Sequence, residues 1–136
     1  METATVRWVG KQEFAATSPS GHAVTFDSDR QANEGTGPME MVLMALGACT
    51  ATDIVIILEK KRQKLQSLEV FCTGERADDP PRVWVKIEVL FRVRGNVDEG
   101  ALKHAIQLTR DKYCSVAAML QKTAKMTWRH EILRAS

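Results

Sequence analysis

The stretch GPMEMVLMALGACTATDIVIILEKKRQK, residues 37–64, decides the fold of this chain. Gly37 suits an N-cap position, and Pro38 suits the first helical position, where its missing N–H costs nothing. Four basic residues between positions 60 and 64 complement the negative end of a helix dipole. The stretch therefore predicts one helix of roughly 40 Å, long enough to cross the whole domain.

The predicted helix is apolar on nearly every side, which is typical of a membrane span or of a buried core helix. Glu40 and Asp53 lie within it, with Gly47, Thr50 and Thr52 between them. No uninterrupted apolar run therefore reaches the ~20 residues that a bilayer needs. We interpret the stretch as a core helix and expect no membrane partner.

The chain has 136 residues, of which 44% are hydrophobic and 26% are charged. This size and composition predict a single globular domain over residues 1–136. The formal net charge of +2 is too small to indicate nucleic-acid binding, and no patch interleaves basic and aromatic residues. We therefore expect no nucleic-acid partner.

The opening residues METATVRWVGK contain no apolar signal core, so nothing in them indicates export. Three cysteines cannot all pair within one chain, and without a secretory signal they are expected to be thiols in a reducing compartment. A cytoplasmic location fits this pattern.

Residue patterns around the central stretch predict a mixed architecture. Strands are predicted over residues 3–9, 13–17, 22–27, 68–75, 83–94 and 125–133. Asn96 or Asp98 can cap a second helix, and a short third helix follows over residues 116–120. The apolar side of the second helix comprises Leu102, Ala105, Ile106 and Tyr113. The order βββ-α-ββ-α-α-β predicts an α+β domain with antiparallel sheet and helices on one face.

One face of a single sheet cannot cover a helix that is apolar all round. A second subunit is the simplest cover, and it would form a two-fold homodimer with the long helices inside. Ala45, Gly47, Ala48 and Ala51 are small enough to let two backbones approach there.

The three cysteines occupy different settings. Cys49 and Asp53 are one turn apart on the central helix, and a neighbouring carboxylate opposes ionisation of a thiol. Cys114 precedes a helix start, where free amides lower the pKa of a thiol, so spacing alone predicts that Cys114 is the more acidic. Activation of Cys49 would need a partner from another segment, for which Arg30 is a candidate. Cys72 is expected to be an inert core residue.

His22, His104 and His130 show no ligand spacing with each other or with the cysteines. His104 is predicted on the solvent side of its helix, and His130 on the inward face of the last strand. The sequence contains no glycine-rich phosphate loop, no GxSxG and no HExxH. We expect neither a metal nor another cofactor.

The segment GPMEMVLMALGACTATD, followed much later by KYCSVAAML, resembles the OsmC/Ohr superfamily and most closely its YhfA-like subgroup. The resemblance covers essentially the whole chain, including the order of its elements. It implies an intertwined homodimer in which antiparallel sheets wrap around two long central helices. It also implies two thiol sites at the dimer interface.

The resemblance further implies a reaction. In characterised branches, the cysteine of the central helix attacks an organic hydroperoxide and becomes a sulfenic acid, which a second cysteine resolves to a disulfide. Cys49 matches the attacking cysteine and Cys114 the resolving one. A dithiol reductant, such as a lipoylated protein, would then restore both thiols.

The family stabilises the attacking thiolate with an arginine that a glutamate holds. Arg30 matches this arginine to within one residue of offset. The family glutamate follows the proline directly, whereas here Met39 does, and Glu40 comes one residue later, rotated by about 100° to the side opposite Cys49. Glu40 can instead serve as a third-position N-terminal carboxylate. The orienting carboxylate could also come from Glu34 or from the other chain.

Two functional hypotheses remain open, besides a purely structural or stress-accessory role. The first is a thiol peroxidase acting in oxidative stress. The second is a catalytically weak dimeric binding protein for a small apolar or thiol-reactive molecule. An apolar substrate pocket, which would favour an organic over an inorganic hydroperoxide, is predicted from Val42, Leu46, Ile56 and Met119, with Asp53 beside them.

Overall fold

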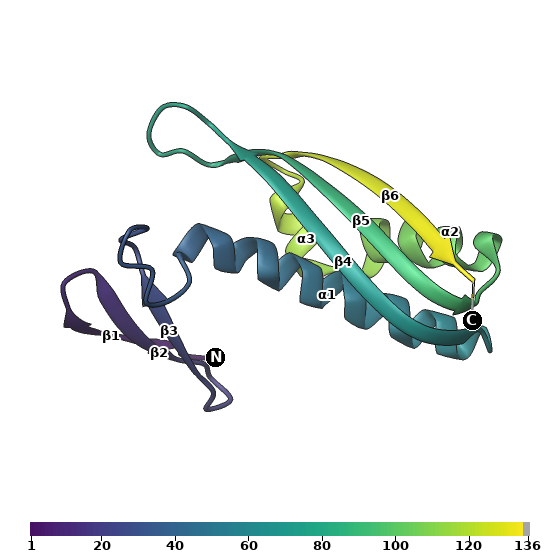
Figure 1. The fold of residues 1–136 in the computed structure, drawn as a ribbon, viewed down its shortest axis with the longest axis horizontal. Coiled ribbons are helices and arrows are strands. Elements are labelled where there is room, and N and C mark those ends of the chain that lie inside the picture. The colour runs from purple at the N-terminus through teal and green to yellow at the C-terminus, as the bar shows by residue number, and fades with distance from the viewer. Residues whose placement is uncertain (135–136) are drawn as a thin grey trace. The chain divides into compact units, whose positions relative to one another are not determined.

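The computed structural model describes residues 1–134 and divides the chain into two compact units, Met1–Val42 and Leu43–Ser136. The predicted order of strands and helices is confirmed, with one π-helical turn added (Figure 1). The elements are β1 (Thr5–Gly10), β2 (Glu13–Thr17), β3 (Ala23–Asp27), α1 (Pro38–Lys60), β4 (Lys64–Arg76), β5 (Trp84–Asn96), α2 (Glu99–Leu108), the π-helical turn η1 (Thr109–Tyr113), α3 (Ser115–Leu120) and β6 (Lys125–Leu133). The assignment of the whole chain to a single domain stays a prediction.

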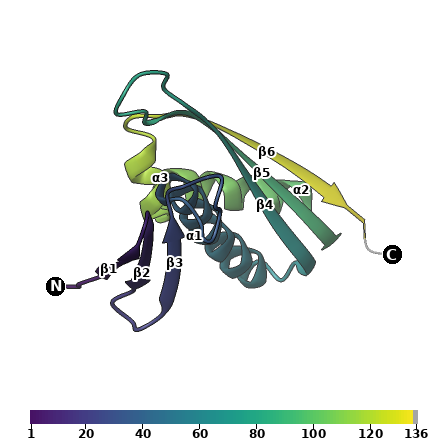
Figure 2. The same cartoon turned by 60° about the vertical axis from the view of Figure 1, so that its left-hand side comes forward.

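The first unit contains an antiparallel sheet in the order β1-β2-β3 (Figure 2). Trp8 pairs with Phe14, and Phe14 pairs with Phe26, so the three rings share one face of the sheet. Val6 and Trp8 on this face remain largely exposed. The first unit therefore presents an apolar sheet face that it covers only in part.

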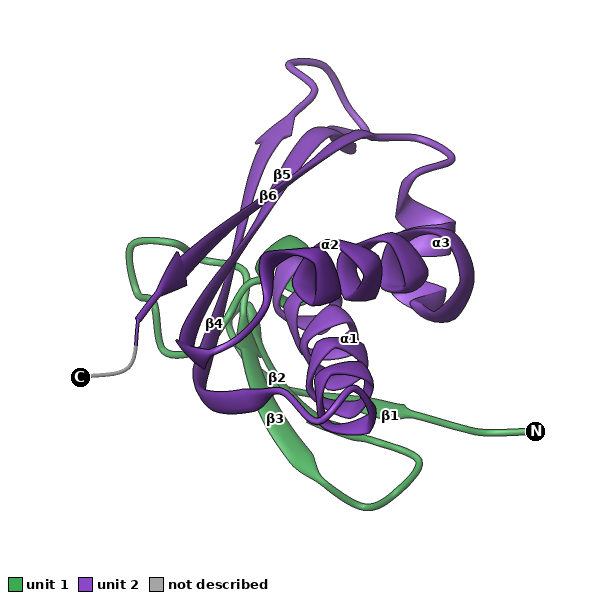
Figure 3. Ribbon diagram, turned by 90° about the vertical axis from the view of Figure 1, so that its right-hand side faces the viewer, with its two compact units in different colours: residues 1–42 green, residues 43–136 purple. Residues whose placement is uncertain are grey.

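The second unit contains a sheet in the order β4-β5-β6, with α1 and α2 on one of its faces (Figure 3). β4 and β5 pair antiparallel, as predicted, but β5 and β6 pair parallel. The prediction of purely antiparallel sheets is therefore wrong for this edge. The reason is the long connection through α2, η1 and α3, which carries the chain back to the starting end of β5.

The core of the second unit lies between this sheet and the helices. It confirms the alternation predicted along β5, because every second side chain from position 87 to 93 is buried. Its fully buried members include Leu46, Ile54 and Leu58 of α1, Ile87, Val89, Phe91 and Val93 of β5, and Leu102 and Ala105 of α2. Tyr113 is exposed, contrary to the prediction, because the π-helical turn changes the number of residues per turn and carries Tyr113 off the apolar stripe.

The start of α1 agrees with the sequence, whereas its end comes four residues early. Lys64 begins β4 and does not belong to the last helical turn. The helix ends in a Schellman arrangement, in which the Gln63 N–H donates to the Leu58 carbonyl at 2.9 Å and the Arg62 N–H to the Glu59 carbonyl at 2.9 Å. Arg62 adopts a left-handed conformation with φ of 58°. This reversal directs the chain into β4.

Helix α1 remains poorly covered. By length and composition it could cross a membrane, a test that core helices of soluble proteins also pass, and only 28% of its most apolar 18-residue window is buried. Met44 and Ile56 are 57% and 45% exposed, and Ala45 and Ala48 are also exposed. A helix with this much exposed apolar surface calls for a partner. The sequence predicted a second subunit as that partner.

Candidate active site

Cys49 lies in the middle of α1, half-buried and facing the start of α3. Burial acts to raise the pKa of its thiol, and the carboxylate of Asp53 acts in the same direction. Hydrogen bonding from the Cys114 thiol, the Val116 backbone N–H and the Ser115 hydroxyl outweighs both and leaves the pKa of Cys49 below its ordinary value. These donors therefore favour the thiolate form of Cys49.

Cys114 has the opposite character, although it is the N-cap of α3. Burial, followed by its hydrogen bond to Cys49, raises the pKa of Cys114 to about 12. The N–H of Ala117 donates to the Cys114 sulfur at 3.3 Å, which favours the thiolate but does not offset the burial. The prediction that Cys114 is the more acidic thiol is therefore wrong.

Spacing along the sequence shows each helix alone and misses hydrogen bonds between two helices. The Val116 N–H at the start of α3 donates to Cys49 of α1, whereas the Ala117 N–H donates to Cys114. Cys114, which is itself 2% exposed, remains protonated and donates to Cys49. The two thiols therefore divide into an acidic one and a protonated neighbour.

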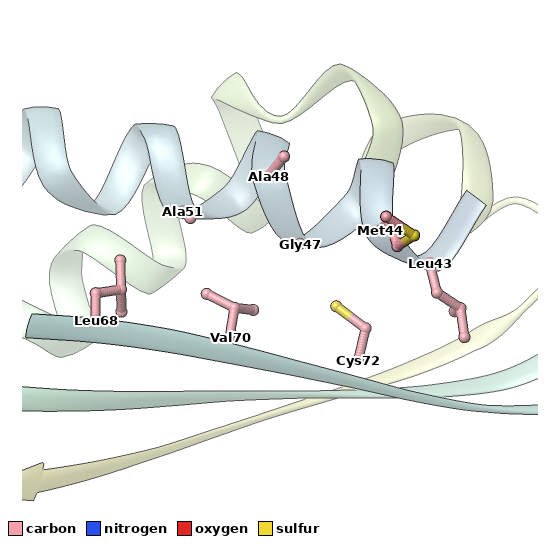
Figure 4. Close-up of a pocket in the computed structure, with 8 residues that line it drawn as sticks. All are labelled: Leu43, Met44, Gly47, Ala48, Ala51, Leu68, Val70 and Cys72. Atoms are coloured by element: carbon pink, nitrogen blue, oxygen red, sulfur yellow. The ribbon is translucent and has the colours of Figure 1, made fainter. Parts of the chain in front are cut away.

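Cys72 lies on β4, in a groove of about 420 Å³ between this strand and α1 (Figure 4). Leu68, Val70 and Cys72 point from the strand toward the helix, and a Cβ atom placed on Gly47 would lie 3.5 Å from the Cys72 sulfur. Burial raises the pKa of Cys72 to about 11. Cys72 is half-buried beside an open groove, so the expectation of a core position is only partly correct, while its raised pKa agrees with an inert thiol.

Arg30 and Glu40 meet in the first unit, where Arg30 Nη1 forms an ion pair with Glu40 Oε1. Arg30 Nη2 donates to the carbonyl oxygens of Asp27 and Gly35, the second at 3.2 Å. The one-residue displacement of Glu40 therefore does not prevent it from holding the arginine. Because Arg30 belongs to the first unit and Cys49 to the second, the role of Arg30 at the thiol stays a prediction.

Glu40 has a second task at the start of α1. Its Oε1 atom accepts the N–H of Gly37 at 2.8 Å, which is the reach-back half of a capping box. A Cβ atom on residue 37 would lie 3.2 Å from Glu40 Oε1 and 3.4 Å from Arg30 Cζ. Gly37 therefore allows the arginine, the glutamate and the helix start to approach one another closely.

Asp27 organises the loop that carries Arg30. Its Oδ1 atom accepts the Asp29 N–H at 2.9 Å, and its Oδ2 atom accepts the Glu34 N–H at 3.0 Å. These bonds, led by the one from Glu34, lower the pKa of Asp27, so the carboxylate stays ionised. Glu34 thus contributes its backbone to the loop, while Glu40 supplies the carboxylate that holds Arg30.

Within residues 1–134, no group of three or more histidine, cysteine, aspartate or glutamate side chains could hold a metal ion. His130 Nε2 instead lies 3.4 Å from Glu99 Oε2. His104 lines a separate groove together with Asp53 and Ile56.

Comparison with known proteins gives this arrangement a context. A family model described as OsmC-like protein matches residues 31–129. This chain belongs to the OsmC-like family. Protein YhfA of Escherichia coli K12 is 41% identical over 133 residues, which cover 97% of this chain and 98% of YhfA.

Solved structures share the fold of this chain. A hypothetical protein from Aquifex aeolicus VF5 superposes with a TM-score of 0.91 at 28% identity, over 100% of this chain and 98% of that one. The organic hydroperoxide resistance protein OhrB of Bacillus subtilis has a TM-score of 0.66 at 14% identity, over 96% of this chain and 98% of OhrB. OhrB therefore supports the shared fold alone.

The five pocket residues predicted for this OsmC-like protein do not all line one groove. Asp53 and Ile56 line one groove of about 470 Å³ between α1, α2 and η1, together with Ile57, Lys60, Lys61, His104, Leu108 and Tyr113. Leu46 is fully buried in the core, Val42 belongs to the first unit, and Met119 is largely exposed on α3. A substrate pocket formed by all five stays a prediction.

Sequence reasoning on this OsmC-like chain missed the groups that interact most closely with Cys49. Ser115 and the Val116 amide follow Cys114 directly, so the KYCSVAAML motif contained them. Thr109 was also missed; it is one of the few fully buried polar residues of the second unit. A threonine at the end of an apolar helical stripe gives no signal until the helix with which it pairs is known.

Proposed function

We propose that this protein is a thiol-dependent peroxidase that reduces organic hydroperoxides, with Cys49 as nucleophile and Cys114 as resolving thiol. The observation that carries the proposal is the contrast between the two thiols. The pKa of Cys49 is lowered by donors from residues 114–116, whereas the pKa of Cys114 is raised to about 12. An attacking thiol with a lowered pKa beside a partner thiol with a raised pKa suits a two-cysteine peroxidase.

The reaction proceeds in balanced steps. The Cys49 thiolate attacks the peroxide oxygen, the O–O bond breaks, and the alkoxide leaves as an alcohol after taking up a proton. The resulting sulfenic acid is attacked by the Cys114 sulfur, so that an S–S bond forms, the S–O bond breaks and water leaves with the Cys114 proton. A dithiol then donates two electrons, becomes a disulfide itself and restores both thiols.

Arg30 supports the attack in this proposal as a cation held by Glu40 and by the loop around Asp27. A guanidinium with fixed geometry would stabilise a thiolate or polarise a peroxide oxygen. The protein would act in the cytoplasm, where cellular dithiols keep cysteines reduced.

The active form would be a homodimer. Apolar side chains are exposed on more than one side of α1, among them Met44 and Ile56, and much of the apolar face of the β1-β2-β3 sheet is exposed too. A second copy of the chain would cover both surfaces at once, so a homodimer is the simplest explanation for them. Sedimentation velocity at micromolar concentration should give a dimer, and a monomer would contradict this part of the proposal.

The peroxidase itself is tested by counting free thiols before and after one molar equivalent of cumene hydroperoxide. Two thiols should be lost, with a burst of peroxide consumption that Cys49→Ser abolishes. The enzyme proposal fails if no thiol is lost within minutes and Cys49→Ser behaves as the wild type.

A binding protein is the second candidate, and the groove beside Cys72 favours it. The groove is apolar, with a volume of about 420 Å³, which suits a small hydrophobic molecule. A ligand that raises the melting temperature while all three thiols remain intact would support this alternative.

A further inference from the structure

Thr109 contacts the segments that carry both active-site cysteines. Its side chain is fully buried at the start of the π-helical turn η1. Its hydroxyl donates to Asp53 Oδ2 on α1 at 2.6 Å. Its carbonyl oxygen accepts the backbone N–H of Cys114 at 2.9 Å. Two hydrogen bonds thus connect the helix of Cys49 to the backbone of Cys114.

The backbone of this segment is unusual. In a regular α-helix the Cys114 N–H would bond to the carbonyl of residue 110, whereas here it bonds to Thr109, five residues back. Single π-helical turns of this kind occur frequently at functional sites. Here the turn ends at Tyr113 and leaves Cys114 extended, as the N-cap of α3.

Asp53 has an unfavourable effect on Cys49, and its hydrogen bond with Thr109 gives a reason for its presence. Its negative charge, one turn along α1, opposes ionisation of Cys49. A carboxylate at this place therefore works against the attacking thiol, unless it is needed for another purpose. Its short hydrogen bond with Thr109 provides that purpose, since a charged acceptor strengthens the bond.

We propose that Asp53 and Thr109 are positioning residues that hold residues 114–116 against α1, so that Ser115 and Val116 can donate to Cys49 and Cys114 can reach its sulfenic acid. The inference rests on the proposed peroxidase function. It assigns two effects to the hydrogen bond. The first is to keep the donors of residues 115 and 116 at the attacking thiol. The second belongs to the resolving step, in which the S–O bond of the sulfenic acid is exchanged for the S–S bond and water leaves.

Two pairs of variants separate this role from simple stabilisation. Thr109→Val removes the hydroxyl with little change of volume, and Thr109→Ser keeps it. Asp53→Ala and Asp53→Asn both remove the charge, but only the asparagine keeps an oxygen that can accept from Thr109. If Thr109→Val does not fold, the Asp53 pair still decides, because alanine and asparagine are both tolerated on a helix.

The experiment adds one equivalent of cumene hydroperoxide and follows two products, the Cys49–Cys114 disulfide and the dimedone adduct of the Cys49 sulfenic acid. Thr109→Val and Asp53→Ala should form the disulfide about tenfold more slowly, with more trapped adduct, because residues 114–116 are no longer held against α1. Thr109→Ser and Asp53→Asn should restore most of the rate. A purely structural bond would lower the melting temperature without changing the ratio of the two products.

A second readout needs no peroxide. The rate at which iodoacetamide alkylates Cys49 at fixed pH should fall in Thr109→Val, because the donors of residues 115 and 116 are displaced, and should be restored in Thr109→Ser. If the wild type is oxidised and alkylated as expected while both members of each pair behave alike, the positioning role is overturned and the peroxidase stands. If the wild type loses no thiol to hydroperoxide, the peroxidase and the resolving role fall together.

Discussion

Helix α1 carries one thiol, Cys49, and packs beside a second, Cys72 of β4, and the pKa values of the two are shifted in opposite directions. On one side Cys49 accepts hydrogen bonds from residues 114–116, and its pKa is lowered although burial opposes this. On the other side Cys72 faces an apolar groove, and burial raises its pKa to about 11. The difference teaches that burial raises the pKa of both thiols, and that hydrogen-bond donors from a distant segment reverse this effect at Cys49 alone.

The largest expected effect is the loss of peroxidase activity when Cys49, but not Cys72, is replaced. Cys49→Ser should lower the rate of cumene hydroperoxide reduction by at least about a thousandfold, because the nucleophile itself is lost. The matched control, Cys72→Ser, should change the rate by less than about twofold, since that thiol is held protonated. Peroxide consumption in a stopped-flow assay measures both rates. Equal losses of rate in the two variants would contradict the difference between the two thiols.

Cys114→Ser is expected to have the next largest effect, on turnover rather than on attack. The first equivalent of hydroperoxide should still be consumed, because the serine hydroxyl can replace the donor to Cys49. Turnover with a dithiol should fall by about tenfold or more, since the sulfenic acid can no longer be resolved internally. Mass spectrometry should find the oxidised Cys49 as a dimedone adduct; a disulfide to Cys72 in its place would contradict the assigned partner.

A hydrogen-bond donor can be introduced beside Cys72 by mutation. A Cβ atom at position 47 would lie at ordinary contact distance, 3.5 Å, from the Cys72 sulfur. Gly47→Ser should therefore bring a hydroxyl near Cys72 and speed its alkylation by about three- to tenfold, whereas the control Gly47→Ala should not. Site-resolved alkylation at pH 8 measures the effect, and equal rates in the two variants would show that a donor alone does not activate this side.

The smallest expected effect is electrostatic. Asp53→Asn removes a charge that opposes ionisation, so the pKa of Cys49 should fall and its alkylation at pH 7 should be about two- to fivefold faster. Cys72 should be unaffected, because its raised pKa comes from burial. Alkylation rates of both thiols in the same sample provide the internal control, and a slower Cys49 would show that the carboxylate supports rather than opposes the thiolate.

The fold was predictable because its signals are local. The ends of α1, the alternation along β5 and the Asp98 cap of α2 depend on neighbouring residues, and the structure confirms them apart from the early end of α1; the Ala101 N–H bonds to Asp98 Oδ2 at 3.0 Å. The parallel pairing of β5 and β6 was missed because it depends on the path of a long connection. A hydrophobic pattern specifies faces but not strand direction.

The site was predictable only in part, because several of its contacts join segments that are distant in sequence. Cys49, Cys114, Arg30 and Glu40 were identified as candidates, and the structure brings them together in two pairs. The order of acidity was wrong because the Val116 amide and the Ser115 hydroxyl act on a helix that lies far away in sequence. Such contacts between segments follow from packing, which a single sequence does not specify.

The most direct test of the central claim is the pH dependence of alkylation, followed separately for each cysteine by peptide mass spectrometry in the reduced protein. The account predicts that Cys49 reacts first and that its half-maximal rate lies below the pKa of an ordinary thiol, whereas Cys72 and Cys114 react far more slowly at neutral pH and reach their half-maximal rates near pH 11 and pH 12. A profile in which Cys114 titrates below Cys49 would contradict it.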